Sequence, residues 1–360
     1  MRIAISTGGG DAPGLNAVIR AAVLAAVGRG WEVVGIRRGF GGLLGEELDL
    51  VPLGRRDVRG ITHLGGTILG TTNRGNPFRW PVHQPDGTWA EVDRSDELIA
   101  RFGEHGLSAL IMVGGDGSLR IGYDLWRKGL PIVGVPKTID NDVGGTVITF
   151  GYDTAVTTAT EAIDKVHSTA ESHDRVMVVE VMGRHAGWIA LNSGLAGSAD
   201  VILIPEIPYD IERVCDKVRE REGMGRHYTI MVVAEGAVPR DGSVTLKEKA
   251  GVGTVDRLGG VGEQVAIEVG RRTGKETRSL TLGHLQRGGS PTTFDRLLGL
   301  RFGAAAVRAI GEGRFGQMVS SDPPHIATVP LAEALSEPKR VPLSSDTVQT
   351  ARELGVCLGD

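Results

Sequence analysis

Short apolar segments typical of buried strands alternate along this chain with longer segments that have the apolar periodicity of helices. This alternation predicts the α/β class, with mostly parallel sheets covered by helices on both faces. With 360 residues, the chain is expected to form two doubly wound α/β domains. Strands are expected at 2–7, 32–36, 109–113, 131–135, 175–181, 200–204, 228–233 and 279–282. One helix is expected to begin at about residue 16, and another is expected to follow the loop at 182–188 and end at 196. Further helices are expected at 95–105, 153–170, 210–222, 261–273 and 293–311, before a less regular C-terminal region.

The composition argues against several classes of protein. The net charge of −4 gives no electrostatic reason to expect nucleic acid or an anionic membrane as a partner. The chain begins with a strand-like segment rather than a signal peptide, and no apolar run approaches the length of a membrane span. Cys215 and Cys357 are single and far apart, which fits a reducing, cytoplasmic setting. The polar, glycine-rich residues 238–260 are expected to be a flexible loop.

The segment Pro136–Asp142, with the sequence PKTIDND, directly follows the apolar run at 131–135. Thr138, Asp140 and Asp142 alternate in it, so an extended segment would place all three side chains on one side. Two carboxylates this close suit a general base beside a metal ion or another charge. The alternative is an Asx-rich turn without a catalytic role, because Asp-Asn-Asp is also favourable turn chemistry.

Polar or glycine-rich clusters follow strand after strand. The first, Gly8–Gly14, stands between a strand and a helix, where backbone N–H groups hold phosphate, although it matches neither the dinucleotide fingerprint nor the P-loop. Each cluster alone is compatible with turn chemistry. Because ligands of open α/β sheets bind at the carboxyl ends of the strands, the clusters together predict an enzyme that handles phosphate. The others are Gly114–Ser118, Pro136–Asp142, Met182–Trp188, Glu235–Gly236 and His284–Ser290.

Several of these segments match one known family in identity and order. GGDAPG at 9–14, GGDGS at 114–118, PKTIDND at 136–142, MGR at 182–184 and GHLQRGGSP at 283–291 resemble the phosphofructokinases. The match extends from residue 1 to about 310, and GGDGS is its least specific part, because NAD kinases and lipid kinases carry a similar stretch. The resemblance implies a phosphofructokinase-like fold and transfer of a phosphoryl group to the 1-hydroxyl of fructose 6-phosphate.

On this resemblance, the catalytic roles belong to Asp140, Thr138, Asp142 and Arg184. Asp140 aligns with the base that takes the hydroxyl proton. Thr138 aligns with a residue that binds the transferring group, and Arg184 with one that steadies its charge. Asp116 and Asp142 align with residues on the Mg²⁺ side. Phosphoryl transfer needs positioning and charge neutralisation more than covalent chemistry, which agrees with these roles.

The resemblance also assigns the sugar-phosphate side. Arg175, Arg278, His284 and Arg287 align with the cradle of the 6-phosphate, a dianion that arginine binds with a fork of donors. Arg175 and Arg278 would come from a neighbouring subunit, so a homo-oligomer, and specifically a homotetramer, is expected. The alternatives are surface ion pairs for the arginines and a satisfied core histidine for His284. The expected sugar-side contacts also include Thr138, Asp140, Asp142, Met182, Gly183, Arg184 and Glu235.

The nucleotide side is assigned to the first part of the chain. A nucleotide domain is expected from 1–150 plus about 288–335, and a fructose 6-phosphate domain from 151–287 plus about 336–360. The expected donor-binding residues are Gly10, Asn73, Arg74, Asp116, Gly117, Ser118 and Lys137.

Gly117 and Lys137 leave two phosphoryl donors open. In the family, pyrophosphate users tend to carry Asp and Lys at these positions, and typical ATP users carry Gly at both. An Asp at position 117 would repel the α-phosphate of a nucleotide, so Gly117 favours ATP, and pyrophosphate remains the alternative donor. Bacterial members controlled by ADP and phosphoenolpyruvate have several basic residues at an effector site. Here Arg20 is kept but Leu24 replaces a second Arg, so that form of control is not expected.

Two other functions compete with this one. A kinase of the NAD or lipid type would share Gly114–Ser118, but it does not predict Pro136–Asp142. A non-catalytic sugar-phosphate-binding regulator on the same fold could lose Asp140 without penalty. Asp140, Asp142 and Arg184 are all present, which favours the enzyme.

Overall fold

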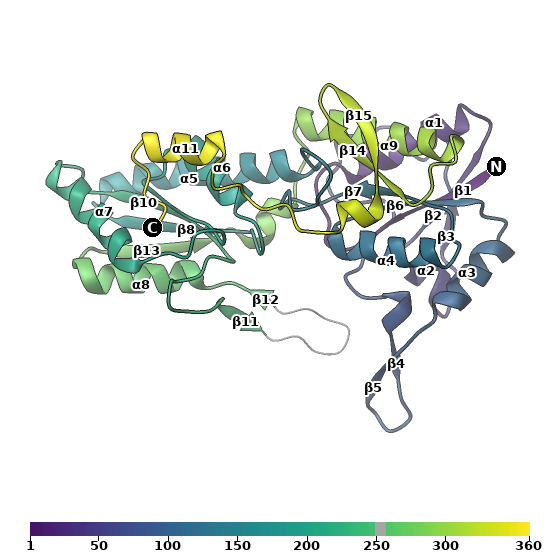
Figure 1. Cartoon of the computed structure of the whole chain (residues 1–360), viewed down its shortest axis with the longest axis horizontal. Helices are drawn as coiled ribbons and strands as arrows, with labels where there is room; N and C mark the ends of the chain where they lie inside the picture. Colours follow the sequence, from purple (N-terminus) through teal and green to yellow (C-terminus); the bar gives the residue numbers. More distant parts are fainter. Residues whose placement is uncertain (249–256) are drawn as a thin grey trace.

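The computed structural model describes residues 1–248 and 257–360, which form two lobes, each built around one main sheet (Figure 1). The sheet of the first lobe has seven strands, in the order β15 (His325–Pro330), β14 (Gln317–Asp322), β7 (Ile132–Pro136), β6 (Ala109–Gly114), β1 (Arg2–Thr7), β2 (Glu32–Ile36) and β3 (Leu50–Pro52). The strands from β14 to β2 pair in parallel, and the edge strands β15 and β3 are antiparallel to their neighbours.

Helices cover both faces of this sheet, because successive residues of a strand point to opposite sides. Ile3 packs into the core on one face, and Ala4 into the core on the other. The first face carries α1 (Leu15–Val27) and α9 (Thr293–Gly311). The second face carries α2 (Gly41–Leu44), α3 (Ser95–Glu104) and α4 (Asp116–Arg127).

The second lobe has a four-stranded parallel sheet with the same layered construction. Its order is β13 (Thr277–Thr281), β8 (Val176–Val181), β10 (Thr229–Ala234) and β9 (Val201–Leu203). One face packs against α5 (Tyr152–Ser172), α6 (Trp188–Ala196) and α11 (Asp346–Glu353). The other packs against α7 (Ile211–Gly223) and α8 (Val261–Thr273). The two layered, mostly parallel sheets confirm the predicted α/β class.

Some segments differ from the sequence prediction. The C-terminal region, expected to be less regular, forms the hairpin β14–β15, α10 (Leu331–Ala334) and α11. A second antiparallel hairpin, β4 (Trp80–His83) and β5 (Trp89–Val92), projects from the first lobe after η1 (Pro77–Arg79) (Figure 1). The loop predicted at 238–260 contains residues outside the described ranges, and the short strands β11 (Leu246–Glu248) and β12 (Arg257–Leu258) pair on either side of them.

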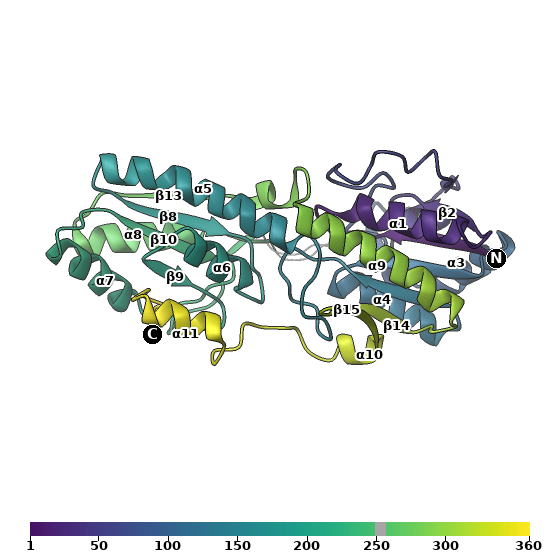
Figure 2. The same cartoon turned by 90° about the horizontal axis from the view of Figure 1, so that it is seen from above.

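The chain passes between the lobes at 137–151, 287–293 and 335–345. The N-terminal ends of α5 and α9 meet between the lobes, where a buried Asp295 carboxylate accepts hydrogen bonds from Thr154 N (2.8 Å) and Thr154 Oγ1 (2.6 Å) (Figure 2). The last crossing runs along one side of the molecule from α10 to α11 (Figure 2). Within the described ranges, no helix is long and apolar enough to cross a membrane.

Candidate active site

The carboxyl ends of β1, β6 and β7 carry glycine-rich or acidic segments, and those of β8 and β10 carry Met182 and Glu235. Charged groups from the two lobes act on one another across this junction. Asp140, which follows β7, interacts electrostatically with Glu235 and with Arg287. Asp116, at the start of α4, interacts with His185. The polar ends of both parallel sheets therefore face a common region, as expected for a ligand site of this fold class.

The segment after β7 is a turn, which is one of the two forms that the sequence left open. The Thr138 hydroxyl accepts a hydrogen bond from Asp140 N (3.1 Å) and donates one to Asp142 Oδ1 (3.0 Å). Asn141 has φ 51°, a left-handed conformation that Asn tolerates better than most residues. Thr149 Oγ1 closes the turn by donating to Thr138 O (2.8 Å). The two interpretations of this segment, an Asx-rich turn and a pair of close carboxylates, are therefore compatible, because the turn brings Thr138, Asp140 and Asp142 together.

Asp140 has the properties of a general base. Its Oδ1 is buried and has no hydrogen-bond partner among the described residues. Burial, followed by the neighbouring Asp142 carboxylate, raises the pKa of Asp140 to about 7, while Arg287 and Lys137 oppose the shift. A carboxylate with a pKa near neutrality accepts protons more readily than an exposed aspartate.

Lys137 is directed at the first glycine loop. Its side chain is buried, and Nζ donates a hydrogen bond to Gly10 O. Burial, together with the Arg287 charge, lowers the pKa of Lys137 to about 8. Arg287 lies at the same loop and donates from Nη1 to Asp11 O (3.2 Å). Arg287 therefore connects the second lobe to the first glycine loop, and its place in the sugar-phosphate cradle stays a prediction.

Two glycine loops pack so closely that side chains are excluded. A Cβ at Gly8 would lie 2.8 Å from Ser118 Oγ, and a Cβ at Gly114 would lie 2.3 Å from Ser118 Cβ. In contrast, a Cβ at Gly117 would meet no atom within 4 Å. Gly117 therefore leaves open space at the start of α4, where backbone N–H groups favour a phosphate.

The loop at 70–75 packs beside the first glycine loop. Gly9 N donates to Thr72 O (3.0 Å), and Thr71 Oγ1 donates to Gly9 O (2.6 Å). Asn73 and Arg74 are exposed at its end, and Arg74 N donates to Thr72 Oγ1 (3.0 Å). The structure thus brings the predicted nucleotide-side residues to the edge formed by β1 and β6.

Asp116 and Asp142 come from the ends of two neighbouring strands and interact electrostatically. Burial raises the pKa of Asp116, and the Asp142 carboxylate adds to the shift. The described residues contain no group of three or more His, Cys, Asp or Glu side chains that could hold a metal ion unaided. Two carboxylates nevertheless fit Mg²⁺, because this ion is commonly bound by one or two carboxylates together with substrate phosphates and water.

On the second lobe, the loop after β8 is tied to η2 (Gly283–Arg287). Met182 N donates to the buried Gln286 side chain at Oε1 (3.3 Å), and Gly236 N donates to Gly183 O (3.1 Å). Burial, followed by the Glu180 carboxylate, raises the pKa of Glu235 to about 7, while Arg287 and Arg184 lower it. Met182, Gly183, Arg184 and Glu235 thus lie around one end of the second sheet.

Arg175 and Arg278 are not part of this group. Both bind one oxygen of Glu276, with Arg175 Nη2 at 2.9 Å and Arg278 Nη2 at 2.5 Å. Arg175 precedes β8 and Met182 follows it, so a strand rise of about 3.3 Å per residue separates them by roughly 20 Å. His284 is exposed on η2. One chain alone therefore does not bring Arg175 and Arg278 to Asp140.

Sequence reasoning missed several side chains around the turn at Thr138–Asp142, which contains the candidate catalytic residues. Asn141 lies inside the motif that was singled out, but its role as an acceptor for Thr149 N (3.1 Å) needs a contact eight residues away. His185 directly follows Met182–Arg184, and its charge interactions with Asp142 and Asp116 link the two lobes. Lys339 contacts Asn141 from the C-terminal segment, and no local pattern marks it.

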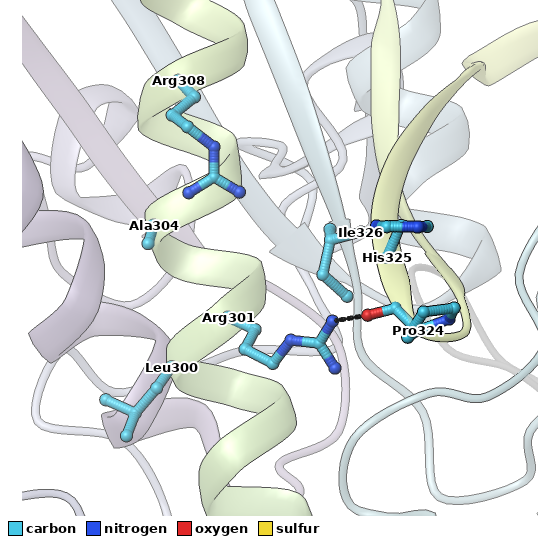
Figure 3. Close-up of a pocket in the computed structure, with 7 residues that line it drawn as sticks. All are labelled: Leu300, Arg301, Ala304, Arg308, Pro324, His325 and Ile326. Atoms are coloured by element: carbon cyan, nitrogen blue, oxygen red, sulfur yellow. Dashed lines mark hydrogen bonds between the residues drawn. The ribbon is translucent and has the colours of Figure 1, made fainter.

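A separate groove of about 490 Å³ lies between α9 and the β14–β15 hairpin (Figure 3). Arg301 and Arg308 extend from α9 toward the hairpin, and Arg301 Nη2 donates to Pro324 O (2.5 Å). None of the residues that line this groove is a candidate site residue. The groove is therefore distinct from the site between the lobes.

Comparisons with known proteins agree with this arrangement. The family model described as phosphofructokinase matches residues 2–310. A Chloroflexus aurantiacus protein named ATP-dependent 6-phosphofructokinase is 53% identical over 361 residues, covering 100% of this chain and 98% of its own. A Synechocystis protein named ATP-dependent 6-phosphofructokinase 1 is 49% identical with the same coverage. An Amycolatopsis methanolica protein named pyrophosphate–fructose 6-phosphate 1-phosphotransferase is 51% identical, covering 95% of this chain and 96% of its own.

Solved structures give the same result for the fold. The Pichia pastoris phosphofructokinase has a TM-score of 0.79 and 33% identity, and the match covers 99% of this chain but 37% of that chain. The pyrophosphate-dependent phosphofructokinase of Marinobacter aquaeolei has a TM-score of 0.79 at 23% identity, with 100% and 92% covered, which supports the fold alone. Because the family model spans most of the chain and full-length relatives exceed half identity, this chain belongs to the phosphofructokinase family.

Proposed function

We infer that the chain transfers a phosphoryl group from ATP, bound with Mg²⁺, to the 1-hydroxyl of fructose 6-phosphate. The observation that carries this inference is the buried Asp140 Oδ1, which has no partner among the described residues and a pKa raised to about 7. It lies where the donor side and the sugar side meet. A base in that position can take a hydroxyl proton as the oxygen attacks phosphorus.

The reaction is a displacement at the terminal phosphorus of the donor. Asp140 accepts the proton of the 1-hydroxyl, the sugar oxygen forms a bond to phosphorus, and the bond to the ADP oxygen breaks. Arg184 steadies the transferring group, and the Thr138 hydroxyl does so when its single proton turns from Asp142 Oδ1 to a phosphoryl oxygen. When bound, Mg²⁺ held by Asp116 and Asp142 supplies further neutralisation of the phosphate charge.

The same turn supports the assignment of roles within the carboxylate pair. Asp142 Oδ1 already accepts from Thr138 Oγ1 (3.0 Å), whereas Asp140 Oδ1 accepts from no described residue. A free, buried oxygen suits the base, and a fixed carboxylate suits a metal ligand. The base is therefore assigned to Asp140 rather than Asp142.

Two observations favour ATP as donor. The space above Gly117 is open, so position 117 itself places no carboxylate against the nucleotide phosphates. Lys137 Nζ is already bonded to Gly10 O, so this lysine supports the loop and does not block it. Relatives with either donor in their names are about equally similar to this chain. Gly117, rather than overall identity, therefore carries the assignment.

The remote position of Arg175 and Arg278 supports an oligomer with shared sites. Both lie at the end of the second sheet opposite Asp140, so a neighbouring subunit is needed to bring this pair to the sugar phosphate. The edge strand β13 is largely exposed, and Leu280 on it and Leu285 on η2 are apolar side chains left 39% and 68% exposed. Such a face suits an isologous contact, and we propose a homotetramer.

The domain boundaries and the cellular location of the protein are also proposals. We propose a nucleotide domain from 1–150 with about 288–335, and a sugar-phosphate domain from the remainder, because these segments pack around the first and second sheet. The free Cys215 and Cys357 support a reducing cytoplasm.

A coupled assay of fructose 1,6-bisphosphate formation tests the function. Wild-type protein with Mg²⁺ should use ATP in preference to pyrophosphate, and Asp140→Asn should lose about 10²–10⁴-fold in turnover with little change in sugar affinity. The matched control is Asp153→Asn, which changes a half-buried carboxylate outside the site. An Asp140→Asn enzyme within a few-fold of wild type would remove Asp140 from the role of base, and a strong preference for pyrophosphate would reverse the donor assignment.

A further inference from the structure

The segment that joins α10 to α11 brings the half-buried Lys339 to the turn at Thr138–Asp142, the proposed catalytic turn. Lys339 Nζ donates to Asn141 Oδ1 (2.8 Å), Thr146 O (3.0 Å) and Val147 O (2.8 Å). An ammonium group has three donors and no acceptor, so these contacts use its full capacity. Three oxygens of one short stretch therefore converge on a single positive charge.

The backbone N–H and the backbone carbonyl of Lys339 are both hydrogen-bonded as well. Lys339 N donates to Asp142 O (2.8 Å), and Lys339 O accepts from Trp188 Nε1 (3.1 Å) at the start of α6. The ammonium lies 5.7 Å from the centre of the Trp188 ring, within the range of a cation–π contact. Lys339 thus contacts the catalytic turn and the second lobe at once.

A neighbouring contact fixes this crossing to the second lobe. Val341 N donates to Glu206 Oε1 (2.8 Å), and both carboxylate oxygens of Glu206 also accept from Gly187 N (3.1 Å each). Gly187 directly precedes α6, which begins at Trp188. The position of Lys339 is therefore set by the second lobe, while its ammonium is bound to the turn.

The residue that Lys339 binds has a strained conformation. Asn141 stands between Asp140 and Asp142 with φ 51°. Its Oδ1 accepts from both Lys339 Nζ (2.8 Å) and Thr149 N (3.1 Å). A residue in the left-handed region keeps that conformation only when its surroundings determine it. Thr149 Oγ1 lies 3.4 Å from the same oxygen, so Lys339 and Thr149 together hold this side chain, and hence the direction of the flanking carboxylates.

We propose that Lys339 is a positioning residue for phosphoryl transfer, which holds Asp140 and Asp142 in register through Asn141 and couples this turn to the second lobe. This inference rests on the proposed function, in which Asp140 is the base. Lys339 itself does not touch the reacting atoms. It acts because a displacement of about 1 Å at the base is enough to lose roughly 10²-fold in rate.

The kinetic test uses Lys339→Ala and Lys339→Met in the full chain. Both should lower kcat by about 10²-fold and change KM for fructose 6-phosphate much less, because the substrate contacts remain. Adding n-propylamine, which matches the atoms removed in Lys339→Ala, should restore part of the lost kcat. The amine should not affect Lys339→Met, whose side chain fills the space.

Lys275→Met is the matched control, because Lys275 Nζ forms an ion pair with Glu222 (2.5 Å) on the second lobe and contacts no candidate site residue. It should keep wild-type kcat. An unchanged kcat in Lys339→Met overturns the proposal. A loss of kcat in Lys339→Ala that the amine leaves unchanged does so as well, because it points to general disruption.

A measurement without turnover separates this proposal from the proposed function. Amide hydrogen exchange at residues 141–149 should become roughly 10-fold faster or more in Lys339→Met, because three oxygens of this stretch lose the ammonium group that binds them. Equal exchange in the variant and the wild type overturns the proposal whatever the catalytic results. Should the Ala and Met variants fail to fold, Lys339→Arg provides the same readouts, because a planar guanidinium cannot direct three donors to the same three oxygens. If Asp140→Asn stays active while exchange accelerates, the assignment of the base fails and the structural role of Lys339 stands.

Discussion

Asp140 is surrounded by charges that act on its pKa in opposite directions. Burial and the carboxylates of Asp142 and Glu235 raise it, and the cations Arg287 and Lys137 lower it. These charges come from both lobes. The net result, a pKa of about 7, keeps the carboxylate poised between its two protonation states at neutral pH.

This balance predicts a pH dependence. A base works only when deprotonated, so kcat/KM should fall as the pH drops below about 7. Glu235→Gln removes one carboxylate that raises the pKa of Asp140, so the midpoint of the acid limb should move to lower pH. Rates of both proteins, each scaled to its own plateau, test this. The substrate phosphate titrates identically with both, so an unmoved midpoint, or one moved to higher pH, would contradict the prediction.

Gly117 provides a second prediction at this scale. Gly117→Asp places a carboxylate in the open space beside the donor phosphates, a like-charge contact worth on the order of several kcal/mol. ATP-dependent kcat/KM should fall at least about 10²-fold, while fructose 6-phosphate binding stays near normal. Activity with pyrophosphate should suffer less, because that donor lacks the nucleoside and its attached phosphate.

The control for Gly117→Asp is Gly117→Ala, which adds volume without charge where no atom lies within 4 Å. It should stay close to wild type. Neither variant should unfold the protein, because Gly117 lies in the first turn of α4, where an acidic residue is favourable. ATP activity that survives in Gly117→Asp would show that the donor phosphates lie elsewhere.

At the scale of elements, sequence patterns predict the helices, strands and loops that are determined by residues next to one another in the chain. The strand at Ile132–Pro136 was predicted at 131–135, and the glycine loops were also identified from sequence, because apolar strands and strand-to-helix loops leave contiguous signals. In β14, the buried Ser320 and Ser321 interrupt any such run. Their bonds are to Gly145 O (2.5 Å) and Thr146 Oγ1 (2.9 Å), which lie 175 positions away in the chain. Tertiary context, rather than propensity, makes this strand.

The candidate site also contains residues that the local sequence predicts and residues that only tertiary contacts bring to it. Gly8, Gly114 and Asp140 belong to short segments whose chemistry is evident from the sequence. Lys339 contacts Asn141, which lies 198 positions away in the chain, because the C-terminal segment from α10 to α11 passes this turn. For Thr138–Asp142 the sequence left an extended segment and an Asx-rich turn open, and the structure has the turn. The Thr138 hydroxyl accepts from Asp140 N, which favours the turn over continuation of the strand.

At the scale of the whole molecule, the separation of Arg278 from Asp140 predicts complementation between subunits. Arg278→Ala and Asp140→Asn chains should each be inactive, because each lacks one essential group. When the two are mixed and their subunits exchange, some sites combine a normal Asp140 with a normal Arg278 from the other chain. Recovery of part of the wild-type rate is expected in the coupled assay. Mixed oligomers that form and stay inactive would mean that each site uses one chain only.

Because the chain passes between the lobes three times, neither lobe can be duplicated or fused separately at the level of the gene. Neither lobe is one uninterrupted stretch, since the first takes residues before 137 and after 293, and the second takes the middle and the C-terminal end. No single cut in the gene can therefore release either lobe intact. The four strands of the second sheet lie together within residues 176–281, whereas the first sheet is split between residues 2–136 and 317–330, so only a piece that spans both parts can be copied or fused without breaking the first sheet.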